Sequence, residues 1–278
     1  MALKLMYITN QPQIAQIVEQ AGVDRIFVDM EYIGKHLRQG GMDTVQSRHT
    51  AQDAAAIKKV LRKAQLLVRC NPIHEATQDY GSSRQEIDAI VEAGADLIML
   101  PYFKTVEEVR TFISLVNGRA KTMLLVETPE AVACIDEILR LDGIDECHIG
   151  LNDLSLGYGM KFMFEPLANG TVDMLCEKFR KKGIAYGFGG IAALGKGMLP
   201  AERVIREHYR LCSTGAILSR SFCNTALVTD LQQVREIFTE GVRAIRDFEV
   251  ECAGQPEAWA ENQKCVAAIV RQIANGVK

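Results

Sequence analysis

The 278-residue sequence lacks the features that mark several large protein classes. It has no basic excess, because 32 Lys and Arg residues face 35 Asp and Glu residues and the formal net charge is −3. A general nucleic-acid or anionic-membrane binder usually needs a basic excess or patch, so neither partner is expected. No apolar run reaches the roughly 18 residues that span a bilayer, and the first ten residues show no signal-peptide architecture. These absences predict a soluble, cytoplasmic protein.

Cysteine pairs with metal-ligand spacing are also lacking. The eight cysteines are scattered without a Cys-x-x-Cys pair, and several of them, such as Cys70 and Cys134, stand inside apolar segments. Such positions are typical of reduced, buried side chains rather than of a zinc site or a disulfide framework. Hydrophobic residues make up 48% of the chain, which is enough for a large core and argues against disorder.

Short apolar runs alternate with longer helical patterns along the chain. The runs that predict strands are 3–9, 25–30, 66–70, 95–101, 122–127, 146–150, 184–188 and 216–219. The helical patterns are 11–21, 50–63, 83–94, 105–117, 129–140, 170–182, 200–211 and 230–252. Eight strand–helix units without a composition break predict one α/β domain over residues 1–278, a (β/α)8 TIM barrel. A doubly wound open sheet is the alternative, but the glycine-rich turn expected after its first strand is missing.

Charged side chains follow four of the predicted strands. They are Asp29 and Glu31 after the second strand, Arg69 after the third, Glu127 after the fifth and Asp153 after the sixth. Active sites of barrels collect at the carboxyl ends of the strands, so these side chains are expected at one mouth. Carboxylate oxygens suit a hard divalent cation such as Mg²⁺ or Mn²⁺, and an arginine beside it can hold the carboxylate of a 2-oxo acid. Structural ion pairs across the barrel rim are the alternative.

Five motifs occur in an order and spacing that resemble a known family. They are Asp29-x-Glu31, Val68-Arg69, Gly94-Ala95-Asp96, Val126-Glu127-Thr128 and Gly150-x-x-Asp153-Leu154-Ser155. Together they are similar to the class II, metal-dependent pyruvate aldolases of the HpcH/HpaI type, which are grouped with the citrate lyase β-subunit superfamily. The resemblance runs from about residue 20 to 160 and more loosely to 222. It implies a carbon–carbon lyase that joins pyruvate enolate reversibly to an aldehyde, for which a sugar-derived aldehyde is one option.

The resemblance also implies roles for individual residues. Glu127 and Asp153 match the two ligands of a divalent metal, which is Mg²⁺, Mn²⁺ or Co²⁺. Arg69 matches the arginine that binds the pyruvate carboxylate and steadies its enolate. Gly150 and Asn152, together with Asp153, are expected beside the bound oxo acid.

The proton-transferring base is where the chain departs from the family pattern. Asp29 and Glu31 match the family's acidic pair, but the histidine that usually follows is replaced by Tyr32. A tyrosine with a pKa near 10 is a poor base at neutral pH. The alternatives are a metal-bound water oriented by Asp29 or Glu31, His49 from the long polar loop 33–50, or an ionised Tyr32. In the first two cases Tyr32 is expected to donate a hydrogen bond to the acceptor or to wall its pocket.

The glycine-rich stretch 187–197 follows the seventh strand. Barrels often bind phosphate in the loops after strands seven and eight, so this stretch, with Lys196 and Arg220, is one option for a phosphorylated or carboxylated acceptor. The alternative is that the glycines permit tight barrel turns.

Residues 256–278 form an additional amphipathic helical pattern beyond the eighth unit. Its apolar face must be buried against something, and a neighbouring subunit is the family-like solution. The resemblance implies a homo-oligomer built from dimers, such as a hexamer.

Two other functions stay open at this point. One is an acyl-CoA lyase or synthase of the citrate lyase β-subunit type, because Val68-Arg69-Cys70-Asn71 is slightly closer to the Val-Arg-x-Asn of those lyases. The other is a non-catalytic barrel that binds a metal and an oxo acid and lost turnover together with the histidine.

Overall fold

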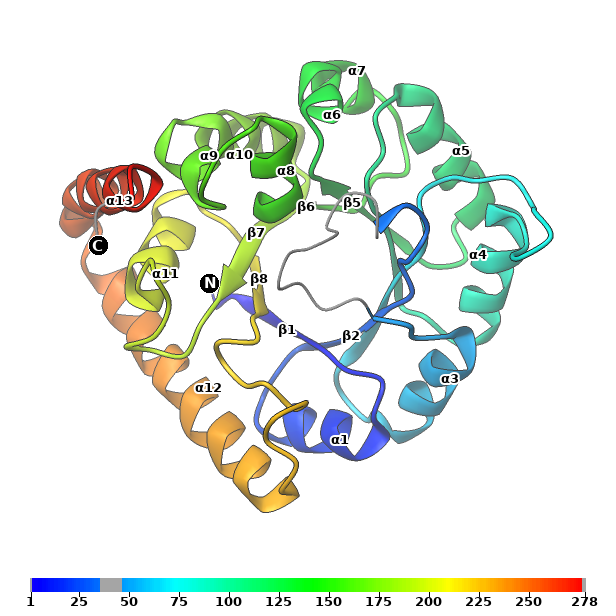
Figure 1. The fold of residues 1–278 in the computed structure, drawn as a ribbon, viewed down its shortest axis with the longest axis horizontal. Coiled ribbons are helices and arrows are strands. Elements are labelled where there is room, and N and C mark those ends of the chain that lie inside the picture. Colours follow the sequence, from blue (N-terminus) through cyan, green and yellow to red (C-terminus); the bar gives the residue numbers. More distant parts are fainter. Residues whose placement is uncertain (1, 36–46, 277–278) are drawn as a thin grey trace.

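The computed structural model describes residues 2–35 and 47–276, and its centre is a closed barrel of parallel strands paired in the order β1 to β8. The strands are β1 (Lys4–Ile8), β2 (Arg25–Asp29), β3 (Gln65–Arg69), β4 (Leu97–Leu100), β5 (Lys121–Val126), β6 (Glu146–Ile149), β7 (Ala185–Ile191) and β8 (Gly215–Leu218). Figure 1 shows the strands as an inner ring and the helices around it. The predicted (β/α)8 barrel is confirmed, and each predicted strand overlaps an observed one.

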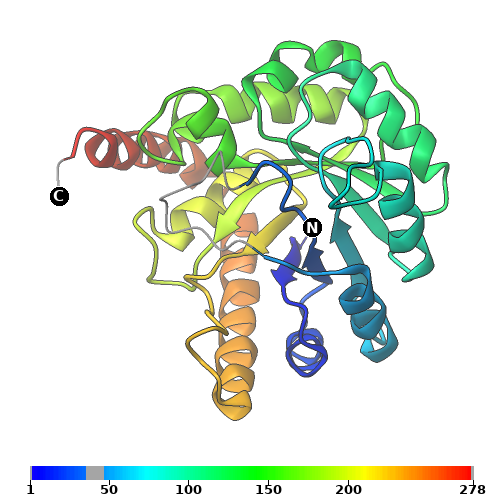
Figure 2. The same cartoon turned by 45° about the vertical axis from the view of Figure 1, so that its right-hand side comes forward.

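The helices of the described residues cover the outside of the ring (Figure 2). They are α1 (Pro12–Gln20), α3 (Ala51–Val60), α4 (Ser83–Glu92), α5 (Val106–Val116), α6 (Pro129–Ala133), α7 (Ile135–Ile138), α8 (Leu151–Gly157), α9 (Glu165–Ala168), α10 (Thr171–Lys182), α11 (Ala201–Arg210), α12 (Leu231–Gly254) and α13 (Trp259–Ala274), with a 3-10 turn at Pro256–Ala258. Within this described part, no helix combines the length and the apolar character that crossing a bilayer requires. The helix predicted over 129–140 is interrupted at Cys134, and α8 and α9 were not predicted.

Alternate residues of each strand point into the barrel and fill it in levels. The middle level is an apolar cluster that takes two successive inward positions from β4 and from β5; its members are Met6, Phe27, Leu67, Leu97, Met99, Met123 and Leu125. The level nearer the amino ends of the strands holds a two-pronged ion pair, in which Arg25 Nη1 and Nη2 lie 2.7 and 2.6 Å from the two carboxylate oxygens of Glu146. The third level comes two residues beyond the middle one and carries Asp29, Arg69 and Glu127. Thus β2 supplies Arg25, Phe27 and Asp29 at three successive depths.

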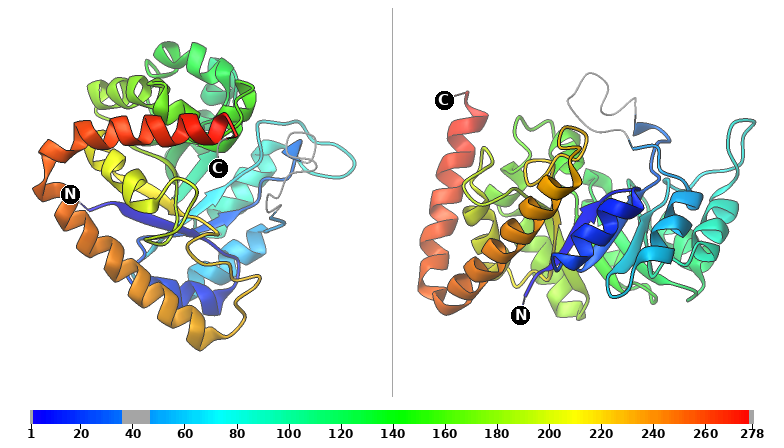
Figure 3. Two further views of the ribbon diagram at one scale, coloured as in Figure 1. Left: turned by 60° about the vertical axis from the view of Figure 1, so that its left-hand side comes forward. Right: turned by 90° about the horizontal axis from the view of Figure 1, so that it is seen from below.

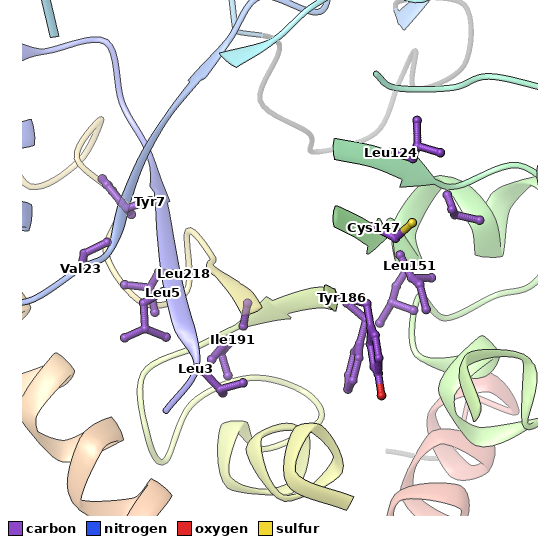
Figure 4. Packing of buried hydrophobic residues seen from close by; sticks show 14 of the residues in the cluster. Leu3, Leu5, Tyr7, Val23, Leu124, Cys147, Leu151, Tyr186, Ile191 and Leu218 are labelled. Carbon is purple, nitrogen blue, oxygen red and sulfur yellow. The ribbon is translucent and has the colours of Figure 1, made fainter. Parts of the chain in front are cut away.

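The outward-facing strand residues and the helices enclose a second, larger apolar core. Figure 4 shows part of it, with Leu3, Leu5 and Tyr7 beside β1 and Leu218 on β8. Burying a leucine or isoleucine side chain contributes about 1.5–3 kcal/mol, so a layer of this size holds the strand ends firmly in place. All eight cysteines lie in the described part as free thiols, and five of them are buried.

The C-terminal helix packs on its own chain. Figure 3 shows α13 along the outside of the barrel, and it contacts α9 and α11. Val266 and Val270 are buried in this contact, and Asn262 Nδ2 donates to Glu207 Oε1 at 2.8 Å. Part of the apolar face of this helix is therefore covered within the chain, whereas Trp259, Ile269 and Ile273 are only partly buried, and packing against a neighbouring subunit stays a prediction. The oligomer itself stays a prediction that rests on the resemblance.

Candidate active site

A cavity of about 470 Å³ opens at the carboxyl ends of the strands. Loops after β1, β2, β6 and β8 form its walls, and Phe27, Met99 and Leu125 of the middle level form its floor. Most of the predicted site residues line it, namely Asp29, His49, Arg69, Glu127, Gly150, Asn152 and Asp153. The other two predicted site residues, Glu31 and Tyr32, are not among the residues that line the cavity.

Asp29, Glu31 and Arg69 form a buried ion-pair cluster with Lys35. Arg69 Nε and Nη2 donate to Asp29 Oδ1 and Oδ2 at 2.7 and 2.8 Å, and Arg69 Nη1 lies 3.4 Å from Glu31 Oε2. Lys35 Nζ lies 3.2 Å from Asp29 Oδ2 and 3.3 Å from Glu31 Oε2. For Asp29, Glu31 and Arg69, the observed contacts are those of the alternative prediction, namely structural ion pairs at the barrel rim.

These contacts fix the charge state of the cluster. Burial alone raises the pKa of Asp29, but the charges and hydrogen bonds of Arg69 and Lys35 outweigh it and hold the pKa well below its usual range. Burial alone lowers the pKa of Arg69, and the charges of Asp29 and Glu31 reverse this and raise it. Asp29 is therefore an anion throughout the neutral range. A carboxylate whose pKa is held so low is a weak base, so these contacts do not favour Asp29 as the group that takes a proton from a carbon acid.

Glu127 and Asp153 stand at the ends of the neighbouring strands β5 and β6. Glu127 Oε1 accepts a hydrogen bond from the backbone amide of Tyr102 at 3.0 Å, and Tyr102 adopts a left-handed conformation with φ of 49°. Asp153 lies in the first turn of α8, which begins after Gly150. A β-carbon on Gly150 would lie 2.6 Å from Glu127 Oε2, so the glycine leaves this carboxylate its space. No group of three or more His, Cys, Asp or Glu side chains within residues 2–35 and 47–276 is arranged as a metal site.

His49 reaches the cavity in a defined orientation. Its Nδ1 accepts a hydrogen bond from the backbone amide of Asp29 at 3.0 Å. Burial lowers the pKa of His49, so the ring is neutral and its proton resides on Nε2. The lone pair of Nδ1 is therefore occupied by this hydrogen bond, and Nε2, which faces away from Asp29, is a hydrogen-bond donor.

Tyr32 is turned away from the cavity. Its side chain is 49% exposed, and its ring packs edge-on against Tyr80 with centroids 6.3 Å apart. Burial, followed by the charge of Glu86, raises the pKa of Tyr32, so it is not ionised. The structure thus does not place Tyr32 where a pocket wall or an acceptor-binding group would have to be.

Asn71 fastens the segment that follows β2. Its Oδ1 accepts hydrogen bonds from the amides of Tyr32 and Ile33, both at 2.9 Å, and its Nδ2 donates to the Met30 carbonyl at 3.2 Å. The Val-Arg-x-Asn match that favours an acyl-CoA lyase therefore has a structural explanation in this chain.

Several lining residues were not assigned from the sequence. Lys35 belongs to the polar loop 33–50, and most of that loop, residues 36–46, lies outside the described residues. No sequence motif points to His148, yet it lines the cavity and donates from Nε2 to the Gly189 carbonyl at 3.2 Å. Its position two residues before Gly150 on β6 is the signal that could have placed it inside the barrel.

The glycine-rich stretch after Ile184 contributes little to the cavity. Gly189 and Gly190 line it with Arg220, whereas Lys196 does not. A β-carbon on Gly187 would collide with the Gly215 carbonyl, so this glycine permits the close approach of β7 to β8. Tight strand packing accounts for Gly187, and the phosphate site stays a prediction.

A cavity with this lining at the mouth of a (β/α)8 barrel is the arrangement found in barrel enzymes. The model of the HpcH/HpaI aldolase/citrate lyase family matches residues 4–165, and the chain belongs to this family. A hydroxypyruvate/pyruvate aldolase from Roseovarius nubinhibens is 25% identical over 160 residues, which are 53% of this chain and 61% of that relative. The match thus spans about three-fifths of the relative's length.

Solved structures of this family share the fold. An HpcH/HpaI aldolase/citrate lyase family protein from Burkholderia cenocepacia J2315 has a TM-score of 0.62 at 15% identity, covering 84% of this chain and 95% of that one. An HpcH/HpaI aldolase from Desulfitobacterium hafniense DCB-2 has a TM-score of 0.59 at 16% identity, covering 84% of this chain and 93% of that one. At this level of identity the likeness concerns the barrel.

Proposed function

We propose that the protein is a class II aldolase that joins the enolate of pyruvate reversibly to an aldehyde and uses a divalent metal. The observation that carries the proposal is that Arg69, Glu127 and Asp153 converge on one cavity from three different strand ends. The family membership and the aldolase named above support the same reaction class.

Glu127 and Asp153 are the residues that would hold the metal. Their donors are carboxylate oxygens, which suit Mg²⁺, Mn²⁺ or Co²⁺, and a pair of them leaves coordination positions for water and substrate. Both residues line the cavity, so a metal held between them would face the space in which the substrate binds. When bound, such an ion supplies Lewis acidity, which polarises the oxo group and offsets the negative charge of the enolate.

Arg69 would bind the carboxylate of the oxo acid. Asp29 occupies the Nε and Nη2 side of the guanidinium and Glu31 Oε2 lies 3.4 Å from Nη1, so a substrate carboxylate would bind at the Nη1–Nη2 edge beside Glu31. Because Asp29 fixes the guanidinium from one side, the Arg69 side chain is already oriented before the substrate carboxylate binds.

The methyl proton would leave to a group other than Asp29 or Tyr32. Asp29 is held ionised by its partners, and Tyr32 lies outside the cavity. A water molecule in the cavity is the base that this arrangement favours. His49 would serve as a hydrogen-bond donor through Nε2 to a substrate oxygen, because its Nδ1 is already bonded.

The acceptor would lie on the side of β1 and β8, which is across the ring from β5. Beside Arg220, the wall there carries uncharged polar side chains, namely Asn10, Gln11, Ser219, Asn224 and Thr225. Amides and hydroxyls of this kind hydrogen-bond to hydroxyl groups, which supports a hydroxylated, sugar-derived aldehyde.

Exchange of the pyruvate methyl protons in deuterated buffer tests the proposal. We expect exchange, followed by NMR, to require an added divalent metal and to be lost in Glu127→Gln and Asp153→Asn, with Glu130→Gln as an exposed control. Exchange that persists after exhaustive chelation would contradict the metal. Absence of exchange with every metal would contradict the aldolase and favour a binding barrel, whereas cleavage of an acyl-CoA ester would favour the lyase alternative.

A further inference from the structure

Lys35 is a buried lysine whose position no motif predicted. The residue is 4% exposed, it lines the cavity, and its ammonium lies between Asp29 and Glu31. Placing a lysine ammonium in such surroundings costs several kcal/mol unless it is paired. Lys35 meets this condition through Asp29 and Glu31, and its place between two predicted site residues points to a task in the site.

The charges of the cluster balance only when Lys35 is included. Asp29 and Glu31 contribute two negative charges, and Arg69 supplies one positive charge. Without Lys35, both carboxylates would compete for the same guanidinium, and one buried negative charge would be left over. An oxo acid brings a further negative charge to this place, and like charges in a buried site repel strongly.

Lys35 also fixes the geometry of Asp29. Asp29 Oδ1 accepts from Arg69 Nε at 2.7 Å and from the Glu31 amide at 3.2 Å, while Oδ2 accepts from Arg69 Nη2 at 2.8 Å and from Lys35 Nζ at 3.2 Å. Four donors on two oxygens leave the carboxylate little freedom to rotate. Lys35 comes from the loop after β2, so its hold on Asp29 is independent of β3, which carries Arg69.

We propose that Lys35 is a positioning residue of the oxo-acid site. Acting through Asp29, its ammonium keeps the Arg69 fork oriented for the carboxylate of a 2-oxo acid. This inference rests on the proposed function, which identifies the ligand as a 2-oxo acid. It adds to the same site a residue on which the affinity for that ligand depends.

Calorimetric titration with pyruvate in the presence of Mn²⁺ tests the inference. The variants are Lys35→Met, which keeps the length of the side chain without its charge, and Lys35→Arg, which keeps the charge. Lys181→Met is the matched control, because Lys181 forms an exposed ion pair with Glu177 on α10. We expect Lys35→Met to weaken pyruvate binding at least tenfold, Lys35→Arg to restore most of it, and the control to change nothing.

Two further readouts separate positioning from a general loss of structure. Titration with Mn²⁺ alone should give the same affinity in Lys35→Met as in the unchanged protein, and KM for pyruvate should rise more than kcat falls. If Lys35→Met does not fold, the double variant Glu31→Gln/Lys35→Met removes one charge of each sign and takes its place. In that variant the pyruvate affinity should stay low, because Asp29 still lacks its second cation.

The outcomes distinguish the two proposals. If the unchanged protein neither binds pyruvate nor exchanges its protons, the proposed function fails. If it does both and Lys35→Met binds pyruvate equally well, the role of Lys35 is refuted. Recovery of full affinity in the double variant would likewise overturn it, because Lys35 would then act only as the counter-charge of Glu31.

Discussion

Gly150→Ala probes the space beside the Glu127 carboxylate. The backbone at Gly150 has a φ of −83°, so alanine meets no conformational strain there. The added methyl group would lie 2.6 Å from Glu127 Oε2, 2.8 Å from Glu127 Cβ and 3.3 Å from Leu125 Cδ1. Because the first two distances are far below van der Waals contact, Glu127 must move, and we expect this shift to break the hydrogen bond of 3.0 Å that its Oε1 accepts from the Tyr102 amide.

The cost of this displacement has two parts. Overpacking of a well-packed site costs about 1–3 kcal/mol, and loss of the hydrogen bond adds about 0.5–1.5 kcal/mol. In a large domain each kcal/mol lowers Tm by roughly 2–4 °C, so a clear shift is expected in a thermal scan. The same movement displaces a proposed metal ligand, and we expect the affinity for Mn²⁺ to fall at least tenfold.

The matched control is Gly254→Ala at the end of α12, where a β-carbon has no neighbour within 4 Å. An exposed change of this kind should alter stability by no more than about 0.5 kcal/mol. If Gly150→Ala keeps both the Tm and the Mn²⁺ affinity of the unchanged protein, Glu127 does not occupy the space described here and the reasoning fails.

Three more predictions concern other levels of the barrel. Arg69→Lys should raise the KM for pyruvate more than tenfold in steady-state assays, because a lysine cannot reproduce the planar fork, and an unchanged KM would show that Arg69 does not bind the carboxylate. Arg25→Leu should cost up to about 3–5 kcal/mol in urea unfolding, because Glu146 loses its two-pronged partner and keeps only the more exposed Lys4 at 3.6 Å, whereas the double variant with Glu146→Leu should recover most of this loss. Burial lowers the pKa of His148 from 6.5 to about 4. The unfolded chain therefore binds a proton that the folded chain does not, and stability should fall as the pH drops from about 6.5 to about 4. In His148→Asn the stability should depend less on pH in this range.

The positions of the strands and of the mouth were predictable because parallel barrel strands are buried on both faces. Such strands appear in the sequence as continuous apolar runs, and a charge directly after a run, such as Glu127, marks the mouth. Alternation could also have placed Tyr32. Asp29 and Glu31 turn into the cluster, so the next residue turns away from it.

Two features depend on contacts that no local pattern records. The helix α8 has seven residues, too few for a helical period to stand out, and Gly150 before it suggested a turn. The contact of Lys35 with Asp29 depends on the path of the loop after β2. Neither propensity nor spacing predicts where a loop lysine will lie, because tertiary packing decides it.

Within residues 2–35 and 47–276, the Arg25–Glu146 pair and the apolar residues above it close the barrel at the amino ends of the strands, so reactants reach the cavity from the carboxyl ends. A cavity that is closed at its floor imposes an order on the binding and release of two reactants. A reactant held next to the floor has to arrive before one held near the opening and cannot depart until the outer one has left. For a reaction that joins two molecules here, this predicts an ordered kinetic scheme, in which product inhibition reveals which partner sits deeper.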